Sequence, residues 1–454
     1  MTMTAQDATT VPAPTDRVVA VTSDAHAGPL LKEQLRDYCP KKYLEQFDEF
    51  VGYAAQLPIR MAGPDPDEDP VRSHLRNALT TGGWDAHQRI RDMDRDGVAG
   101  EVIFHGLNTG RQDFMPWNGP FGAFGLTGFD NELVGLGRHI FNQWLADFVS
   151  VEPERHAGLA HLPIWDPDAC VAEVTWAAEN GLRGVNLPRP QPTIPSYNNP
   201  VWDPFWSACE DLGMPLTTHA QSGPPPPGLI PAPGDFEINM FDIMGDYGRQ
   251  ALPRLTFGGV FERHPKLSLV FTEVIDTWWV PTLARMDNMA LFFQQKALTL
   301  PKAQQVNAGP SGLLRLSKLP SEYCKEQVYI GWTTLAPFEA ADAIENDYVS
   351  QVLWGSDYPH PEGSWQYPRS EDEVPMTHLH LRDSFAEVPA QDAAAMIGGN
   401  AMRVYGFDEA KLRKVADRIN SLTYGELAAP LDGEPEDFVT RSASFAFRRS
   451  GPFV

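Results

Sequence analysis

The chain has 454 residues, 42% of them hydrophobic, and a formal net charge of −24 at pH 7. This acidic balance argues against nucleic acid and against a polybasic membrane anchor, and no run approaches the roughly 18 apolar residues of a membrane span. The four scattered cysteines form no CxxC pair, so we expect free thiols in a cytoplasmic protein rather than a disulfide framework.

The amino-terminal part predicts a leader followed by one strand. Residues 1–17 are rich in Thr, Ala and Pro and lack the segments of a signal peptide, so they are expected to be disordered. The first strand runs from Val18 into Asp24-Ala25-His26. Alternate strand residues face the same side, so Asp24 and His26 point together. The alternative is a helix-capping aspartate beside a surface histidine.

A long insertion follows each of the first two predicted strands. Residues 27–85 predict a helical insertion and a loop, and residues 100–104 predict a second strand that ends at His105. Residues 106–130 form a loop rich in Gly and aromatic residues, including Phe114 and Trp117. Loops of this length are uncommon in compact domains and often functional. Its aromatic residues suit a substrate wall or a subunit contact equally well.

The middle of the chain alternates helical and strand patterns. An apolar stripe at helical spacing predicts a core helix from Leu133 to Phe148. Predicted strands follow at 159–164, 181–187 and 215–218, and the last of them ends at His219. Arg189, after the fourth strand, is either a partner for a substrate carboxylate or an ordinary surface arginine.

Three further strands complete the pattern. The sixth, 267–271, runs into Glu273; the seventh, 328–330, ends at Trp332; and the eighth, 351–357, ends at Asp357, followed by Tyr358-Pro359-His360. His378 and His380 alternate like a metal-binding pair, but they fall in a polar stretch outside any strand. We therefore expect them to be exposed to solvent in a loop.

Eight strand–helix units predict an α/β fold, a (β/α)8 TIM barrel over residues 18–407. The insertions at about 27–85 and 106–130 are expected above the carboxyl-terminal face, and residues 408–454 form a C-terminal extension. Enzymes of this architecture keep their sites at that face.

Three widely separated strands thus end on side chains that can bind a metal. Alone, His219 is more often structural, and Asp357 can cap a turn. Together, these side chains predict one divalent cation at the barrel mouth, and the mixed nitrogen and oxygen ligands suit Zn²⁺, Mn²⁺ or Fe²⁺.

Several motifs resemble those of the amidohydrolase superfamily, in the branch that includes aminocarboxymuconate-semialdehyde decarboxylase and resorcylate decarboxylases. The resemblance spans roughly residues 18–407 and is carried by Ser23-Asp24-Ala25-His26, Leu182-Arg183-Gly184-Val185, Thr218-His219, Trp354-Gly355-Ser356-Asp357-Tyr358-Pro359-His360 and Gly399-Asn400-Ala401. It implies a metal held by Asp24, His26, His219 and Asp357, with Asp357 also taking a proton from metal-bound water.

The chain departs from the family pattern at two positions. Asp24-x-His26 replaces the His-x-His of many members, which suggests a single metal, and Glu273 stands where many relatives have a histidine. Glu273 is a candidate general base or ligand, or it anchors a loop. Decarboxylase relatives depend on that histidine, which disfavours decarboxylation.

We therefore expect a metal-dependent hydrolase in which activated water attacks a C–N or C–O bond of a small aromatic or apolar substrate, with zinc as the favoured metal. The alternative is a lyase, a decarboxylase or hydratase acting on an aromatic or enoic acid. A purely structural metal is disfavoured because a barrel mouth is open.

His360 either polarises the substrate or holds Asp357 in place. The expected catalytic residues are Asp357, His360 and Glu273, the expected substrate contacts are His105, Trp332, Arg189, Phe114 and Trp117, and the expected assembly is a homodimer or larger.

Overall fold

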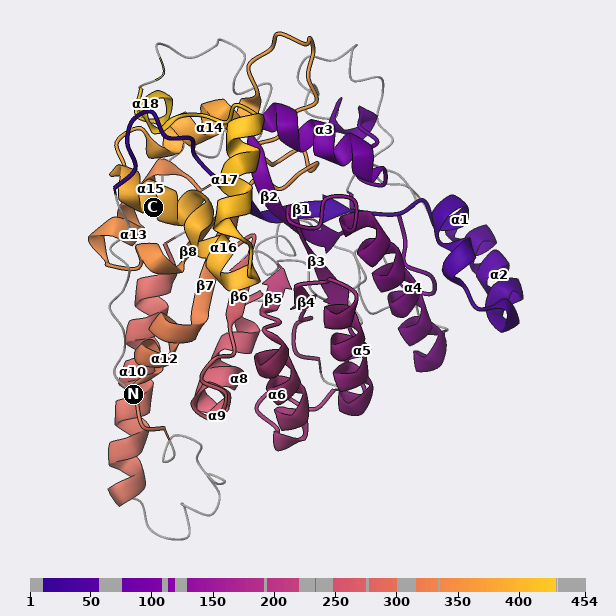
Figure 1. Cartoon of the computed structure of the whole chain (residues 1–454). Helices are drawn as coiled ribbons and strands as arrows, with labels where there is room; N and C mark the ends of the chain where they lie inside the picture. Colours follow the sequence, from indigo (N-terminus) through magenta and orange to yellow (C-terminus); the bar gives the residue numbers. More distant parts are fainter. Residues whose placement is uncertain are drawn as a thin grey trace.

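A computed structural model describes residues 11–56, 76–107, 113–118, 129–191, 194–219, 233, 248–274, 277–299, 316–333, 335–429 and 431. In these residues eight parallel strands form one sheet in sequential order (Figure 1). They are β1 (Ala20–Ala27), β2 (Val98–His105), β3 (His156–His161), β4 (Gly184–Asn186), β5 (Leu216–His219), β6 (Leu269–Thr272), β7 (Val328–Thr333) and β8 (Val352–Gly355).

The two edges of this sheet meet. The backbone N–H of Asp357, just after β8, donates to the carbonyl of Asp24 on β1 at 2.8 Å, and the N–H of His26 donates to the carbonyl of Tyr358 at 2.6 Å. Sequential order, parallel pairing and this contact between the first and last strands confirm the predicted barrel.

Helices follow the strands and surround them (Figure 1). Local capping sets their starts: the Asp85 side chain accepts the N–H groups of His87 and Gln88, and the Asp166 side chain does the same for helix α5. The helices used below are α1 (Leu31–Gln34), α2 (Leu44–Ala54), α3 (Ala86–Asp96), α4 (Asn131–Val149), α5 (Pro167–Glu179), α6 (Asp203–Leu212), α8 (Ala251–Phe257), α9 (Val260–Arg263), α10 (Trp279–Thr299), α12 (Pro320–Gln327), α13 (Pro337–Glu345), α14 (Met376–Phe385), α15 (Ala390–Ala394), α16 (Asn400–Tyr405), α17 (Glu409–Arg418) and α18 (Tyr424–Leu427).

Apolar side chains fill the inside of the barrel. Residues from five strands belong to one buried cluster: Val21, Val102, Leu159, Val270 and Leu353. This packed interior leaves polar chemistry to the strand ends, as in other barrels of this type.

The expected insertion after β1 contains α1 and α2, while residues 57–75 lie outside the described part. Of the expected loop 106–130, only 106–107, 113–118 and 129–130 are described. Among helices in the described ranges, none combines the length and apolar composition that a membrane span requires.

Residues 16–18 contact residues 421–424. Residues 11–17, which we expected in a disordered leader, have a defined backbone here, and the Arg17 guanidinium donates to the carbonyl of Ser421. The N–H of Tyr424 donates to the carbonyl of Asp16, and the N–H of Val18 to that of Leu422. The expected C-terminal extension therefore begins with α17 and α18 packed against the barrel, while residues 1–10 and 432–454 lie outside the described part.

One sequence expectation is wrong here. His378 and His380 lie on helix α14 rather than in an exposed loop, and His380 is fully buried. Because residues two apart on a helix face different directions, the alternation that resembled a metal pair has no such meaning on α14.

Candidate metal centre

The four predicted ligands lie together at the carboxyl-terminal end of the barrel. His26 Nε2 is 3.3 Å from Asp24 Oδ1 and 3.2 Å from Asp357 Oδ1, and His219 Nε2 is 3.6 Å from Asp24 Oδ1. All four side chains are buried. The ends of three strands that are distant in sequence therefore bring these four side chains together.

Several side-chain atoms in this cluster that could bind a metal make no hydrogen bond within the described part of the chain. They are Oδ1 of Asp24, both ring nitrogens of His26 and both carboxylate oxygens of Asp357. Buried polar atoms are almost always hydrogen-bonded, so atoms that converge without such bonds call for another partner. A cation among them would satisfy carboxylate and imidazole atoms together.

The strands fix this arrangement. Asp24 and His26 are two apart on β1, and the Thr333 hydroxyl at the end of β7 donates to Asp24 Oδ2 at 2.8 Å, leaving Oδ1 to face the histidines. Asp357 has a positive φ of 54° and Glu273 one of 60°. Such backbone conformations are uncommon for residues other than glycine and cluster at functional sites.

A second set of side chains borders the ligands. His360 Nδ1 is 3.0 Å from Asp357 Oδ1, and its ring stacks on His26 with centroids 3.9 Å apart. Glu273 Oε2 is 3.4 Å from His219 Nδ1. Oxygen atoms of Glu273, Asp357 and Glu362 also lie within 4.8 Å of one another. The predicted catalytic residues thus lie beside the predicted ligands.

Burial and mutual charge perturb these groups. Burial would raise the pKa of Asp24, but the imidazoles of His219 and His26 outweigh it and hold that pKa well below its usual range. Burial, together with the charges of Asp357 and Asp24, raises the pKa of Glu273 well above normal. For His360, burial alone would lower the pKa, yet Asp357 raises it to about 10. The two shifts therefore run in opposite directions: Asp24 favours its ionised form, whereas Glu273 holds its proton more strongly.

These residues fit one divalent ion. Two carboxylates and two imidazoles from β1, β5 and the end of β8 would hold it: Asp24, His26, His219 and Asp357. Such a mixed donor set suits Zn²⁺, Mn²⁺ or Fe²⁺.

The predicted substrate contacts differ in where they lie. His105 lies at the same end of the barrel, buried, with Nε2 2.6 Å from the carbonyl of Asp113 and its ring 5.9 Å from that of His161. Arg189 is half-buried just beyond β4, and Phe114 is half-buried against the core. Trp117 is buried against Phe47 and Phe50 of α2, so it joins the insertion to the core.

Trp332 is wrongly assigned as a substrate contact. On β7 the residues that face the interior include Gly331, which is close to Ser23, and Thr333, which binds Asp24. Trp332 alternates with them and points outwards, where its ring contacts Tyr348 with centroids 6.1 Å apart. It belongs to the packing between barrel and helices.

Other residues at this end escaped the sequence analysis. Phe104 contacts the rings of His219 and His26, with centroids 4.7 and 5.8 Å apart. His161 ends β3 as His219 ends β5, and Glu362 follows His360 by two residues. The strand-end position was a usable signal for His161. Only the path of the chain beyond β8 brings Glu362 back to the cluster.

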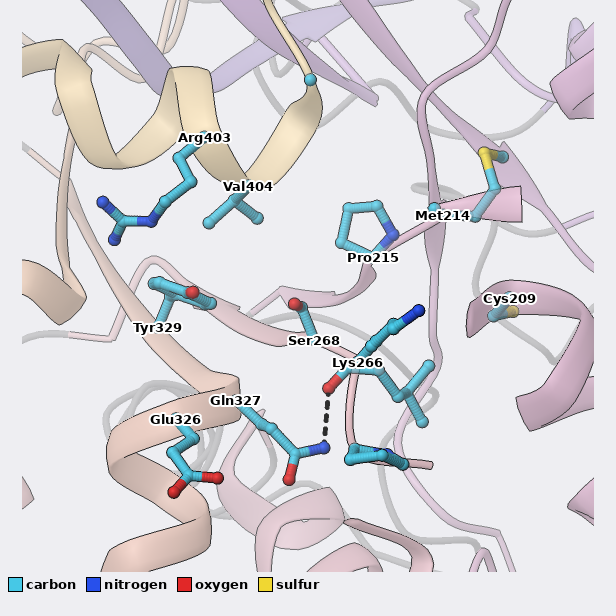
Figure 2. Close-up of a pocket in the computed structure, with 14 residues that line it drawn as sticks. Cys209, Met214, Pro215, Lys266, Ser268, Glu326, Gln327, Tyr329, Arg403 and Val404 are labelled. Carbon is cyan, nitrogen blue, oxygen red and sulfur yellow. Dashed lines mark hydrogen bonds between the residues drawn. The ribbon is translucent and has the colours of Figure 1, made fainter. Parts of the chain in front are cut away.

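A cavity of about 440 Å³ lies at the other end of the barrel (Figure 2). It is bordered by residues that precede β5, β6 and β7, including Pro215, Ser268 and Gln327, and by Arg403 of α16. None of the predicted ligands is among its lining residues. The predicted metal ligands and this cavity therefore lie at opposite ends of the barrel.

Comparisons with known proteins give two sequence matches. Residues 124–407 match the family described as Amidohydrolase. The chain is 26% identical over 341 residues to 2-amino-3-carboxymuconate-6-semialdehyde decarboxylase of Dictyostelium discoideum, covering 72% of this chain and 78% of that protein.

Solved structures support the same fold. The 5-carboxyvanillate decarboxylase of Sphingomonas paucimobilis matches with a TM-score of 0.53 at 20% identity, over 86% of this chain and 100% of the other. The 5-carboxyvanillate decarboxylase of Novosphingobium aromaticivorans, solved with bound manganese, matches with a TM-score of 0.54 at 17% identity, over 86% and 97%. The resemblance found in the sequence motifs is confirmed.

Proposed function

This chain belongs to the amidohydrolase family, and from that premise we propose that it is a metal-dependent lyase that removes CO₂ from a small aromatic or enoic carboxylic acid. The observation that carries the proposal is the buried convergence of Asp24, His26, His219 and Asp357. Within the part of the chain that the structure describes, side-chain atoms of Asp24, His26 and Asp357 make no hydrogen bond. The relatives named above are decarboxylases, which favours the lyase over the hydrolase expected from the sequence.

The proposed cofactor is one divalent ion held by these four residues. When bound, it supplies a Lewis acid that polarises substrate oxygen atoms. Manganese moves ahead of zinc, because a structural relative was solved with manganese and because two of the four ligands are carboxylates.

Glu273 is the proposed proton donor. Decarboxylation replaces a carboxylate by hydrogen: a proton adds to the carbon that bears the carboxylate, the C–C bond breaks, and its electron pair returns to the unsaturated system as CO₂ leaves. A carboxyl group at the edge of the ligand cluster is suitable for this transfer, and Glu273 is buried and adjacent to His219.

The remaining residues would orient the substrate. Both ring nitrogens of His360 face protein acceptors, Asp357 and the carbonyl of Gly106, which suits the role of holding Asp357 in place. Arg189, half-buried beyond β4, is the proposed partner of a second anionic group, and Phe104 offers an aromatic surface beside His219. Assembly as a homodimer or larger oligomer stays a prediction.

Hydrolysis is the second candidate, because the family is described as Amidohydrolase and the same ligands can activate water for attack on a carbonyl. Asp357 would then accept the proton of the attacking water. The two reactions differ in their products, so one assay separates them.

The test is a substrate panel given to protein reconstituted with Mn²⁺ or Zn²⁺. Hydroxybenzoates and enoic acids are expected to release CO₂, and in D₂O the product is expected to carry deuterium at the carbon that lost the carboxylate. Release of a new acid from aryl amides, esters or lactones, without CO₂ from any acid, would replace the lyase by the hydrolase. An Asp24→Ala protein serves as the metal-deficient control.

A further inference from the structure

A buried arginine lies directly behind the strand that carries two of the ligands. Arg89 of α3 is fully buried, and its Nη1 donates to the backbone carbonyl of His26 at 2.9 Å. Its Nε and Nη2 donate to the carboxylate of Glu101 on β2 at 2.8 and 2.6 Å. The guanidinium therefore holds the His26 peptide, while Glu101 fixes the orientation of the guanidinium.

The same guanidinium contacts the other ligand-bearing segment. Its central carbon is 3.7 Å from the centroid of the Tyr358 ring, and Tyr358 directly follows Asp357. The Tyr358 hydroxyl donates to Asp92, also on α3, at 2.7 Å. One helix thus contacts both sides of the seam between β1 and the end of β8.

Among the described residues, the pairing across this seam is an isolated bridge between Ala25 and Tyr358. The pairing of β1 with β2 is irregular between Thr22 and Ala25, the stretch that includes Asp24. Asp24 is instead held across the seam, where its carbonyl accepts from the N–H of Asp357, and by the hydroxyl of Thr22. Small shifts between these segments would change the spacing of Asp24, His26 and Asp357.

We infer that Arg89, oriented by Glu101, is a positioning residue that sets the spacing between the metal ligands of β1 and Asp357. The inference rests on the proposed function, because it requires that these residues bind a metal. Residues behind metal ligands commonly change metal affinity by about 10- to 100-fold when they are altered.

Arginine suits this position for a geometric reason. Its planar fork makes two bonds to Glu101, a third bond to the His26 carbonyl, and a flat contact with the Tyr358 ring. A lysine keeps the charge but supplies neither the fork nor the flat contact. Arg89→Lys therefore tests geometry with the charge unchanged.

The chain also offers a matched control. Arg155 is another fully buried arginine that donates to strand-region carbonyls, those of Val98 and Ala99, at 2.9 and 3.1 Å. It contacts the start of β2, at the end of the barrel away from the ligands. Arg155→Lys is therefore expected to lower stability without altering the spacing of the ligands.

The experiment compares wild type, Arg89→Lys, Glu101→Gln and Arg155→Lys. Affinity for Mn²⁺ is measured from the electron paramagnetic resonance signal of free Mn²⁺, and thermal unfolding is followed without metal. We expect Arg89→Lys to weaken Mn²⁺ binding by about 10- to 100-fold and Arg155→Lys to change it by less than about twofold.

Two results would overturn this inference while leaving the proposed function intact. One is Mn²⁺ affinity in Arg89→Lys equal to that of wild type; the other is an equal loss of affinity in Arg89→Lys and Arg155→Lys. Should Arg89→Lys fail to fold, the milder Glu101→Gln decides, and wild-type affinity in that variant overturns the inference. A wild-type protein that binds no divalent ion overturns the proposed function, and the inference with it.

Discussion

The buried glutamine amides at one end of the barrel and the ligand cluster at the other end differ in how they are hydrogen-bonded. At the amino-terminal end, the Gln351 amide donates to the carbonyls of Cys324 and Val328 at 2.8 and 2.7 Å, and the Gln327 amide donates to those of His264 and Leu267. At the carboxyl-terminal end, His26 and Asp357 converge with ring and carboxylate atoms that make no hydrogen bond among the described residues.

This contrast separates stability from function. A buried polar group whose bonds are complete stabilises the fold, whereas buried groups that face one another without bonds are arranged for a partner. The amino-terminal end therefore holds the strands together, and the carboxyl-terminal end presents ligands. The variants below test this division, from the largest expected effect to the smallest.

Removing one histidine from each end gives the strongest contrast. We expect His219→Ala to lose the bound metal and to slow the reaction by about 1,000-fold or more, because the proposed ion would polarise the substrate. His264, buried at the amino-terminal end beside Glu210, is the matched control. Elemental analysis after gel filtration measures the metal, and equal metal in both variants would remove His219 from the ligand set.

Glu101, between the two ends, predicts a pH dependence of stability. Burial alone would raise its pKa, but Arg89 and His156 lower it from 4.5 to about 2. Because the folded-state pKa is depressed, the ionised form stabilises the fold above about pH 4.5, and this contribution is lost as the pH falls through about 2. It amounts to about 3 kcal/mol at most.

The measurement is the free energy of unfolding against pH for wild type and Glu101→Gln. The wild-type value is expected to fall more steeply between about pH 4.5 and pH 2, since only wild type loses the Glu101 charge there. Parallel curves would show that Arg89 and His156 do not depress the pKa of Glu101.

Changing the proposed proton donor is expected to separate catalysis from metal binding. Glu273→Gln keeps the shape of the side chain but removes the transferable proton, so we expect a rate about 100-fold lower with metal content unchanged. Rates with saturating Mn²⁺ and elemental analysis of the same samples check this. Loss of the metal would identify Glu273 as a ligand instead.

At the amino-terminal end, Gln351→Ala leaves two buried carbonyls without their donor. We expect the free energy of unfolding to fall by about 2 kcal/mol, with Mn²⁺ affinity and rate at wild-type values. Urea unfolding of the metal-free protein measures the loss. A fall in metal affinity would contradict the division between the two ends.

The smallest effect is expected at the rim of the cavity in Figure 2. Lys266 is exposed there, so Lys266→Ala is expected to change stability by less than about 0.5 kcal/mol and to leave the rate unchanged. Urea unfolding and a substrate assay check both values. A clear loss of activity would mean that the cavity takes part in the reaction.

The sequence predicted most of the barrel because strand ends carried a clear signal. Asp24 and His26 share a strand face through the two-residue repeat, and His219 and Asp357 each follow an apolar run. The same repeat explains the error at Trp332. Since β7 runs on to Thr333, Trp332 falls on the outer face, and an error of one residue reverses the face.

Other features depend on contacts that sequence spacing does not encode. Arg89 occurs in a charged helical stretch, and only packing reveals that it contacts both His26 and Tyr358. Glu362 returns to the cluster through the turn after His360. His380 was expected outside because its neighbours are polar, whereas tertiary packing buries it on α14.

The contact of residues 17–18 with residues 421–422 has a consequence for the candidate metal centre. Val18 and Arg17, immediately before β1, are bonded to Leu422 and Ser421. The strand that delivers Asp24 and His26 is therefore anchored at its start by a segment that lies after the last barrel helix. Truncating the protein at residue 407 would remove these hydrogen bonds at the start of β1. A deletion far from every proposed ligand is therefore expected to weaken metal binding.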